Sequence, residues 1–308
     1  MGGTVRSIIK APTIAMLLVS AISALPTRAD AQQDRKITIR FAAMVGDRPF
    51  TCGQSYDGIG ATGSRVTPSD FRFYVSDVQL IDSNGKAIAI KLDQDDRWQY
   101  RNVALLDFED RSGPCLTGTP ETNASVTGTV PVGTYRALRF SLGIPHDLNH
   151  ADATIAPSPL NLTSLFWNWQ AGYKFLRIDL ASKGRAQTIK PGDMPKFGDR
   201  EGSHRLGFAI HIGSTMCAAD GPTKVPASCA NPNRPAIELV NFDPDKDVVV
   251  ADLKALLEGV NVDVNQPETP AGCMSTPTDG DCNPLMRNLG LSIAGGTGEQ
   301  KFFRVQRQ

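Results

Sequence analysis

The sequence predicts an all-β protein: a disulfide-stapled antiparallel β-sandwich with long ordered loops and little helix. Three observations predict it. Segments in which apolar and polar residues alternate recur along the chain, turn signals separate them every ~8–12 residues, and only one short segment has a helical pattern. We expect one domain over residues 32–308, and the alternative is a second, smaller lobe.

The clearest strand is residues 71–81, where Phe71, Phe73 and Val75 share one face. Asn84-Gly85 then predicts a hairpin turn into residues 86–92. The same alternation predicts strands at 36–45, 135–142, 173–180, 206–212, 237–242 and 247–250. Residues 47–70 and the stretch after 103–108 are expected to be loops, residues 130–133 a turn, and 251–257 a helix that starts near Asp252.

Residues 1–31 are typical of a secretory signal peptide. Arg6 and Lys10 precede an apolar run over residues 12–25, and Ala29-Asp30-Ala31 is a small-x-small cleavage site. The run is too short for a membrane span, and no later segment approaches ~18 consecutive apolar residues. We therefore expect a periplasmic or secreted protein without a membrane span.

The charge pattern argues against a nucleic-acid partner. The leader contains three basic residues and one acidic residue, so its removal lowers the formal net charge from zero to −2. Both signs are scattered along the rest of the chain. A nucleic-acid-binding protein needs a concentrated basic face, which the sequence lacks.

The six cysteines all follow the predicted leader. An even number in an oxidising compartment predicts three disulfides, although six cysteines allow 15 pairings. The pairs we expect are Cys52–Cys115, Cys217–Cys229 and Cys273–Cys282, of which the last two close short loops rich in Gly, Pro and Asp. The competing interpretation is a thiolate metal site, but no pair has the CxxC spacing that zinc and iron–sulfur centres favour.

Residues 142–180 concentrate the side chains that can carry a function. They include His146 and His150, two of the four histidines, and Trp167 and Trp169, two of the three tryptophans. On a helix, the four-residue spacing of the histidines would place both rings on one face, as in many metal sites. The alternative for the histidines is that both are exposed loop residues without a ligand. The alternative for the tryptophans is ordinary packing of their indole rings.

The two remaining histidines differ in their context. His211 ends a predicted strand, so it is either a metal ligand or an imidazole hydrogen-bonded at a sheet edge. His204 lies in a charged loop and is expected to be a surface residue. No GxSxG, Walker or HExxH motif is present, so nothing indicates an enzyme. Imidazole ligands in an exported protein suit copper.

Six blocks of sequence, in order, resemble the MbnP-like family of exported bacterial proteins, also described as the four-Cys member of a metallo-mystery pair. They cover nearly all of the mature chain: DFRFYVSDVQLI, WQYRNVALLDFED, LNHADATIAPSPLN, FWNWQAGYKFLRID, FAIHIGSTMC and GCMSTPTDGDC. The resemblance implies a non-catalytic copper-binding protein encoded beside a di-haem, MauG-like relative of cytochrome c peroxidase. The resemblance further implies that this partner oxidises a tryptophan of the protein to kynurenine and that the product binds copper.

The resemblance also implies roles for particular residues. The LNH block makes His150 a candidate ligand and HIGST does the same for His211, with His146 as a further candidate. FWNWQ makes Trp169 or Trp167 the candidate for oxidation, and Trp98 is a third. Neutral imidazoles suit Cu(I), and Met216 and Met274 are candidate thioether ligands. The chain has six cysteines where the family name stresses four, which leaves open which pair is the extra one.

A second function remains open at this stage. Trp167 and Trp169 are separated by a polar residue and followed by Gln170. They would also suit an aromatic platform on a secreted β-sandwich that binds a glycan or a protein. A hydrolase is a distant third, because no nucleophile motif supports it.

Overall fold

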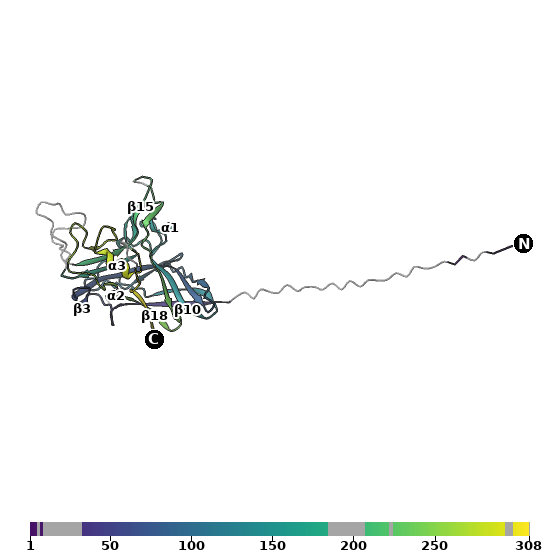
Figure 1. Ribbon diagram of the computed structural model, residues 1–308, viewed down its shortest axis with the longest axis horizontal. Coiled ribbons are helices and arrows are strands. Elements are labelled where there is room, and N and C mark those ends of the chain that lie inside the picture. The colour runs from purple at the N-terminus through teal and green to yellow at the C-terminus, as the bar shows by residue number, and fades with distance from the viewer. Residues whose placement is uncertain (5–6, 9–32, 184–206, 222–223, 293–297, 308) are drawn as a thin grey trace. The chain divides into compact units, whose positions relative to one another are not determined.

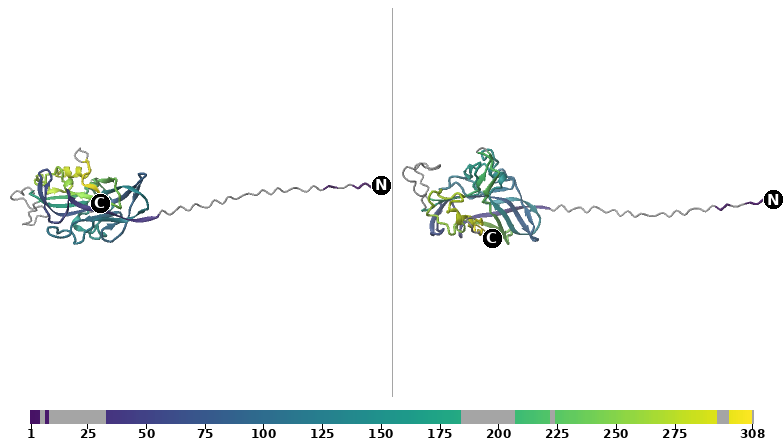
Figure 2. Two further views of the ribbon diagram at one scale, coloured as in Figure 1. Left: turned by 90° about the horizontal axis from the view of Figure 1, so that it is seen from below. Right: turned by 45° about the horizontal axis from the view of Figure 1, so that its top comes forward.

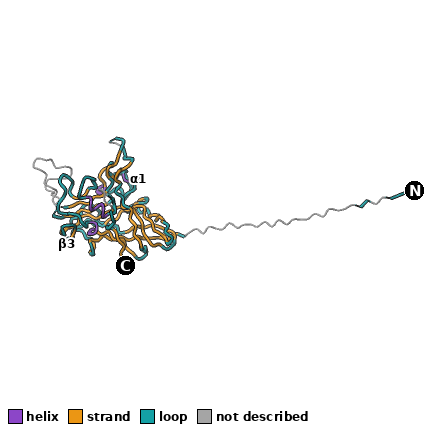
Figure 3. Tube along the Cα trace, in the orientation of Figure 1, coloured by secondary structure: helices purple, strands orange, loops and turns teal. Residues whose placement is uncertain are grey.

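The computed structural model describes residues 1–4, 7–8, 33–183, 207–221, 224–292 and 298–307. The chain divides into two units, Met1–Gln32 and Gln33–Gln308, and the second carries all the features described below (Figure 1). Strands dominate this unit and its helices are short (Figure 3). The expected leader lies almost entirely outside the described residues, and so does His204.

One layer of the unit is a six-stranded sheet. Its strands are β1 (Asp34–Val45), β2 (Arg48–Pro49), β6 (Lys91–Leu92), β9 (Ser125–Pro131), β18 (Asp247–Asp252) and β20 (Phe303–Arg307). Their order is β20-β18-β1-β9-β6, with β2 paired to β1. β1 and β18 are parallel, and the other pairs are antiparallel.

The other layer is a ten-stranded sheet. Its strands are β3 (Tyr56–Ile59), β4 (Ser64–Asp82), β5 (Ala87–Ala89), β7 (Gln99–Tyr100), β8 (Val103–Asp107), β10 (Tyr135–Leu142), β13 (Leu176–Ala181), β14 (Phe208–Ile212), β17 (Ala236–Val240) and β19 (Gly272–Cys273). The path runs β17-β10-β4-β13-β14-β19, and β3, β5 and β8 also pair with β4. Only the β14–β19 pair of this sheet is parallel among the described strands. The prediction of an all-β, disulfide-stapled sandwich is confirmed.

Short elements complete the fold (Figure 2). The hairpins are β11 (Phe166–Asn168) with β12 (Gly172–Tyr173), and β15 (Thr215–Ala218) with β16 (Ser228–Asn231). The helices are α1 (His146–Asn149), α2 (Leu253–Leu256), α3 (Cys282–Asn288) and the 3-10 turn η1 (Thr163–Leu165). No helix in the described part of the chain is long and apolar enough to cross a membrane.

Several sequence predictions need correction. Residues 47–70 are not one loop, because they contain β2, β3 and the start of β4. The predicted turn at 130–133 includes the end of β9. The expected helix at 251–257 is shortened to α2, because β18 continues to Asp252, whose side chain accepts hydrogen bonds from the amides of Lys254 and Ala255. The hairpin at Asn84-Gly85 is present, but after β5 the chain crosses to the other sheet as β6.

A β-bulge in β4 changes which residues face the core. Phe73 and Val75 point into the main core, and so do Val78 and Leu80, although strict alternation would place them on opposite faces. The extra residue is Asp77, which has a φ of 55°, and the register with β10 shifts at this point. An inserted residue of this kind restores the apolar face after the bend.

An apolar cluster packs on each face of the ten-stranded sheet. On one face the main core joins the two sheets, for example where the rings of Phe41 and Phe73 meet at 6.1 Å. On the other face a second apolar cluster is formed with the segment that follows β10, and includes Tyr74, Leu148 and Tyr173. This second cluster fixes the position of α1 and its histidines.

Three disulfides join Cys52 to Cys115, Cys217 to Cys229 and Cys273 to Cys282. These are the pairs expected from the sequence. The Cys217–Cys229 bond links facing residues of β15 and β16. It therefore cross-links that hairpin, which lies beside the histidines of the α1 segment.

Candidate metal centre

The side chain of Leu148 anchors α1 in the second apolar cluster. Pro145 precedes the helix, and the amides of Leu148 and Asn149 donate to its carbonyl oxygen. One helical turn thus separates His146 from His150, and their ring centroids lie 4.9 Å apart. The predicted helical spacing therefore holds for a single turn, and it brings the two imidazoles together.

Hydrogen bonds fix the tautomer of His150. The amide N–H of Tyr173 donates to Oδ1 of Asn149 at 2.9 Å, so the other end of that side chain is its NH2 group. Nδ2 of Asn149 lies 3.2 Å from Nε2 of His150 and donates to it. The other ring nitrogen, Nδ1, lies 3.0 Å from the carbonyl oxygen of Trp169 and donates to it. The lone pair of His150 is consequently on Nε2.

The environment keeps this imidazole neutral. His150 is 3 % exposed, and burial lowers its pKa against the opposing effect of the Trp169 carbonyl, while His146 lowers the pKa further. A neutral imidazole is the form that binds a metal. Its backbone support is tight, since Gly172 has a φ of +79° and a Cβ there would lie 2.4 Å from Asn149.

His146 reaches the same place from the surface. It is exposed, and its Nε2 lies 3.1 Å from the carbonyl oxygen of Pro226. Because a carbonyl only accepts, Nε2 carries the proton and Nδ1 carries the lone pair. Pro226 lies just before β16, so the stapled hairpin holds the second imidazole.

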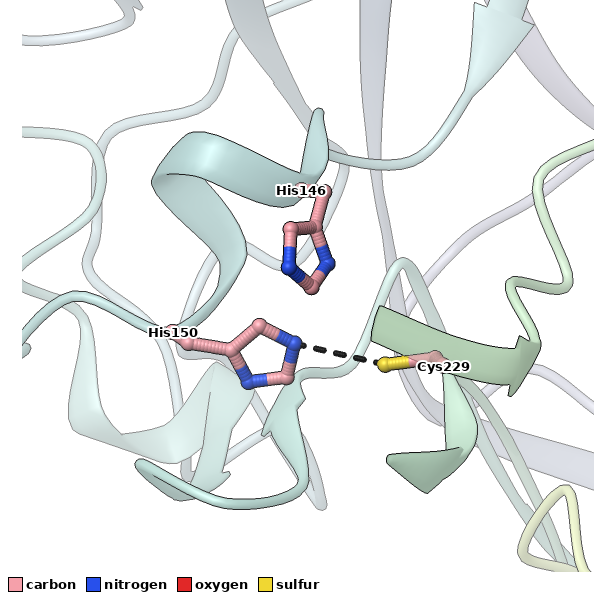
Figure 4. A group of neighbouring side chains, drawn as sticks. All are labelled: His146, His150 and Cys229. Atoms are coloured by element: carbon pink, nitrogen blue, oxygen red, sulfur yellow. Dashed lines mark hydrogen bonds between the residues drawn. The ribbon is translucent and has the colours of Figure 1, made fainter. Parts of the chain in front are cut away.

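One ligand atom each from His146, His150 and Cys229 lie within 4.8 Å of one another (Figure 4). Sγ of Cys229 is 3.4 Å from Nε2 of His150. However, this sulfur is bonded to Cys217 and cannot act as a thiolate, which is the form that binds metals. The donors available are therefore two imidazoles, a set that fits copper.

His211 has a different environment. Its Nε2 lies 2.8 Å from Oδ1 of Asp179, on neighbouring strands β14 and β13. Arg177 binds the same carboxylate at 2.7 Å and also contacts the fully buried Asp70. Burial opposes ionisation of Asp179, but the hydrogen bonds and charges of His211 and Arg177 outweigh it and lower its pKa. Among the described residues, the metal-type cluster at His150 does not include His211.

The tryptophans occupy three settings. Trp169 lies in the turn of the β11–β12 hairpin, and its carbonyl holds His150. Trp167 lies in β11 with its ring against Gly213, where a Cβ would be 2.5 Å from Cζ3 of the indole. Both are partly buried. Trp98 packs against the second cluster beneath Arg97. The strand ends at Asn168, so the two indoles do not lie on one extended segment.

The two candidate methionines differ in burial. Met216 is 64 % exposed and has a φ of 54° in β15, and Met274 is partly buried beside Cys273. The sequence interpretation missed Asn149, the amide that fixes the tautomer of His150. Its position next to a histidine, in a segment that also holds two tryptophans, is the only signal the sequence offers.

The family model MbnP matches residues 34–275. A solved structure, MbnP from Methylosinus trichosporium, is 32% identical and superposes with a TM-score of 0.76, covering 89% of this chain and 99% of that chain. No protein of curated function matches the chain.

Proposed function

Since the chain belongs to the MbnP family, we propose that it is an exported, non-catalytic copper-binding protein whose metal is held by His146 and His150. The observation that carries this proposal is the pairing of two imidazoles on one helical turn, with ring centroids 4.9 Å apart. The periplasm or the exterior of the cell suits its three disulfides.

The residues around the pair perform distinct tasks. Trp169 fixes the tautomer of His150 through its carbonyl, as outer-shell partners of metal-bound histidines commonly do. Binding at Nε2 exchanges the hydrogen bond from Asn149 for a metal bond. Pro226 holds the ring of His146 from the hairpin side. Among the described residues this cluster offers two imidazoles and no carboxylate, which favours Cu(I) over hard cations.

The haem partner enters as part of the same proposal. A di-haem MauG-like enzyme oxidises Trp167 or Trp169 to kynurenine. Cleavage of the indole C2–C3 bond adds two oxygen atoms from peroxide or dioxygen and gives N-formylkynurenine, and hydrolysis then releases formate. The backbone of Trp169 already bonds to His150, so a product in this segment adds a carbonyl and an aniline near the imidazoles.

Metal analysis combined with mass spectrometry tests the proposal. The mature protein would be produced with and without the haem enzyme, and peptide mapping would show whether one tryptophan in 166–173 has gained one oxygen and lost one carbon. We expect copper to bind, and to be lost in His150→Ala and reduced in His146→Ala. His204→Ala is the control. His211→Ala tests the ligand role that the resemblance implies for His211.

Copper binding that survives in both His146→Ala and His150→Ala would contradict the proposed ligands. Absence of both copper and a modified tryptophan would contradict the function. The second candidate, a secreted binding module, is favoured by the partial exposure of Trp167 and Trp169. It predicts binding of a glycan or protein that survives chelators and both histidine variants, and is lost in Trp167→Ala and Trp169→Ala.

A further inference from the structure

Three oxygen-bearing side chains stand at alternate positions where α3 begins: Asp279 and Asp281 precede the helix, and Asn283 lies in its first turn. Alternating Asp and Asn residues form the first half of many calcium loops, where they ligate from positions 1, 3 and 5. The glycine that follows in an EF-hand is Pro284 here, so the chain does not have an EF-hand. The spacing alone is a weak signal.

Two buried oxygens in this loop lack partners. Asp279 is 0 % exposed. Its Oδ1 accepts the amide N–H of Asp281 at 3.0 Å, but its Oδ2 has no hydrogen-bond partner within the described part of the chain, and neither does Oδ1 of Asn283. A buried carboxylate oxygen without a partner is costly. The two residues are four apart across the turn that opens α3, where the amide of Asn283 donates to the carbonyl of Gly280. Side chains at this spacing are neighbours, so one ligand between them would satisfy both oxygens.

The loop also lacks a positive charge. Burial raises the pKa of Asp279 to about 6, and the neighbouring charge of Asp281 adds to this. Burial raises the pKa of Asp281 as well. No Lys, Arg or His of the described ranges forms an ion pair with either carboxylate. A cation would stabilise the ionised form of both groups.

The surrounding structure holds the loop in place. Gln266 makes three hydrogen bonds to it. Its backbone N–H donates to Oδ2 of Asp281 at 2.8 Å. In its side chain, Nε2 donates to the carbonyl oxygen of Thr278 at 3.1 Å, and Oε1 accepts from the backbone N–H of Gly280. The disulfide Cys273–Cys282 closes the loop, and α3 is anchored by Leu285 in the main core. These contacts hold the two carboxylates in place, so a ligand could bind without a large rearrangement of the backbone.

We propose that the loop Asp279–Asn283 binds one Ca²⁺ ion through Oδ2 of Asp279, a carboxylate oxygen of Asp281 and Oδ1 of Asn283, with water completing the shell. Oxygen-only donors suit a hard cation and not copper, so this site is chemically separate from the histidine pair. Few protein ligands and two formal charges correspond to the weak, roughly 10⁻⁴–10⁻³ M affinities of extracellular calcium modules.

Calorimetric titration of the chelator-treated mature protein with CaCl₂ tests the proposal, together with melting temperature as a function of calcium. We expect one site, a melting temperature that rises with calcium, and weaker binding of Mg²⁺. Asp279→Asn and Asn283→Ala should each weaken calcium binding at least tenfold. Asp110→Asn, which changes an exposed carboxylate that accepts from Ser112, should leave it unchanged.

The copper-site variant His150→Ala should also retain calcium binding, which separates this proposal from the function above. No heat of binding and no calcium-dependent melting in the wild-type protein would overturn the proposal. So would unchanged binding in both Asp279→Asn and Asn283→Ala. If one of these variants fails to fold, the other variant and the wild-type titration still decide.

Discussion

Nδ1 of His150 lies 3.0 Å from the carbonyl oxygen of Trp169, which ties the buried imidazole to the backbone of the tryptophan pair. On the other side, Asn149 donates to Nε2 and is itself held by the amide of Tyr173. These three hydrogen bonds form one chain in which each donor and acceptor is determined by its neighbour. The lone pair that a metal needs is therefore assigned before any metal arrives.

The first prediction concerns that tautomer. Two-bond ¹⁵N–¹H correlation spectra of the metal-free protein at neutral pH should show His150 protonated at Nδ1 and not at Nε2, because Nδ1 faces the carbonyl oxygen of Trp169 whereas Nε2 accepts from Asn149. His211 serves as the comparison, since its Nε2 faces Asp179 and must carry a proton. A proton on Nε2 of His150 would contradict the assigned hydrogen-bond chain.

The second prediction concerns Asn149. Asn149→Ala removes the acceptor of the Tyr173 amide, and both residues are buried. An unpaired buried donor costs about 1–3 kcal/mol, so urea unfolding should show a loss of that size. Asn161→Ala, at an exposed position, is the control and should change stability by less than about 0.5 kcal/mol. Equal effects of the two changes would contradict a specific role for Asn149.

The third prediction follows from the lowered pKa of His150, whose main cause is burial. In the unfolded chain the imidazole takes up a proton near pH 6.5, whereas in the folded protein it does so only at lower pH. The free energy of unfolding of the metal-free protein should therefore decrease as the pH falls below about 6.5. Copper should remain bound as the pH passes through 6.5 and be released below it.

The control for this pH effect is His150→Gln, which cannot titrate. Denaturant unfolding measured between about pH 7 and pH 5 should show a smaller loss of stability in the variant than in the wild-type protein, because one of the groups that take up a proton on unfolding is gone. An identical pH dependence would show that His150 has an ordinary pKa in the folded state.

Residue patterns predicted the sheets better than the site. Tyr135–Leu142 alternates regularly and forms β10 with the expected bounds. β9 escaped prediction because Thr and Gly replace larger apolar residues over much of its length, and Asp77 in β4 shows why strict alternation fails at a bulge. The histidine spacing pointed to His146 and His150, but only the fold could show that Cys229 lies beside them.

The placement of His211 illustrates the limit of sequence reasoning about the site. A histidine that ends a strand and precedes a cysteine looks the same whether it binds a metal or a carboxylate. Its partner, Asp179, comes from the adjacent strand through register, which depends on long-range pairing. The role of Asn149 is equally hidden in the sequence, because it depends on Tyr173. The β11–β12 hairpin returns the backbone N–H of Tyr173 to the side chain of Asn149.

The fourth prediction concerns the contact between Trp167 and Gly213. A Cβ at Gly213 would lie 2.5 Å from the indole and equally close to the carbonyl oxygen of Tyr173. Gly213→Ala should therefore displace the indole, shift the tryptophan fluorescence and cost about 1–3 kcal/mol. Gly133→Ala is the matched control, since its nearest neighbour would be 3.7 Å away. Unchanged fluorescence in Gly213→Ala would contradict this packing.

The last prediction concerns the Cys217–Cys229 disulfide, which closes a loop with a sequence separation of 12 beside His150. Replacing both cysteines by alanine frees the hairpin that carries the Pro226 carbonyl, so His146 loses its fixed position. We expect a loss of roughly 2–4 kcal/mol of stability and weaker copper binding.

In Cys217→Ser, by contrast, Cys229 becomes a free thiol next to Nε2 of His150, and its thiolate adds a soft ligand for Cu(I). Copper affinity should therefore be higher in Cys217→Ser than in the double alanine variant, as measured by competition with a Cu(I) chelator. Equal affinities in these two variants would show that the sulfur of Cys229 does not reach the metal.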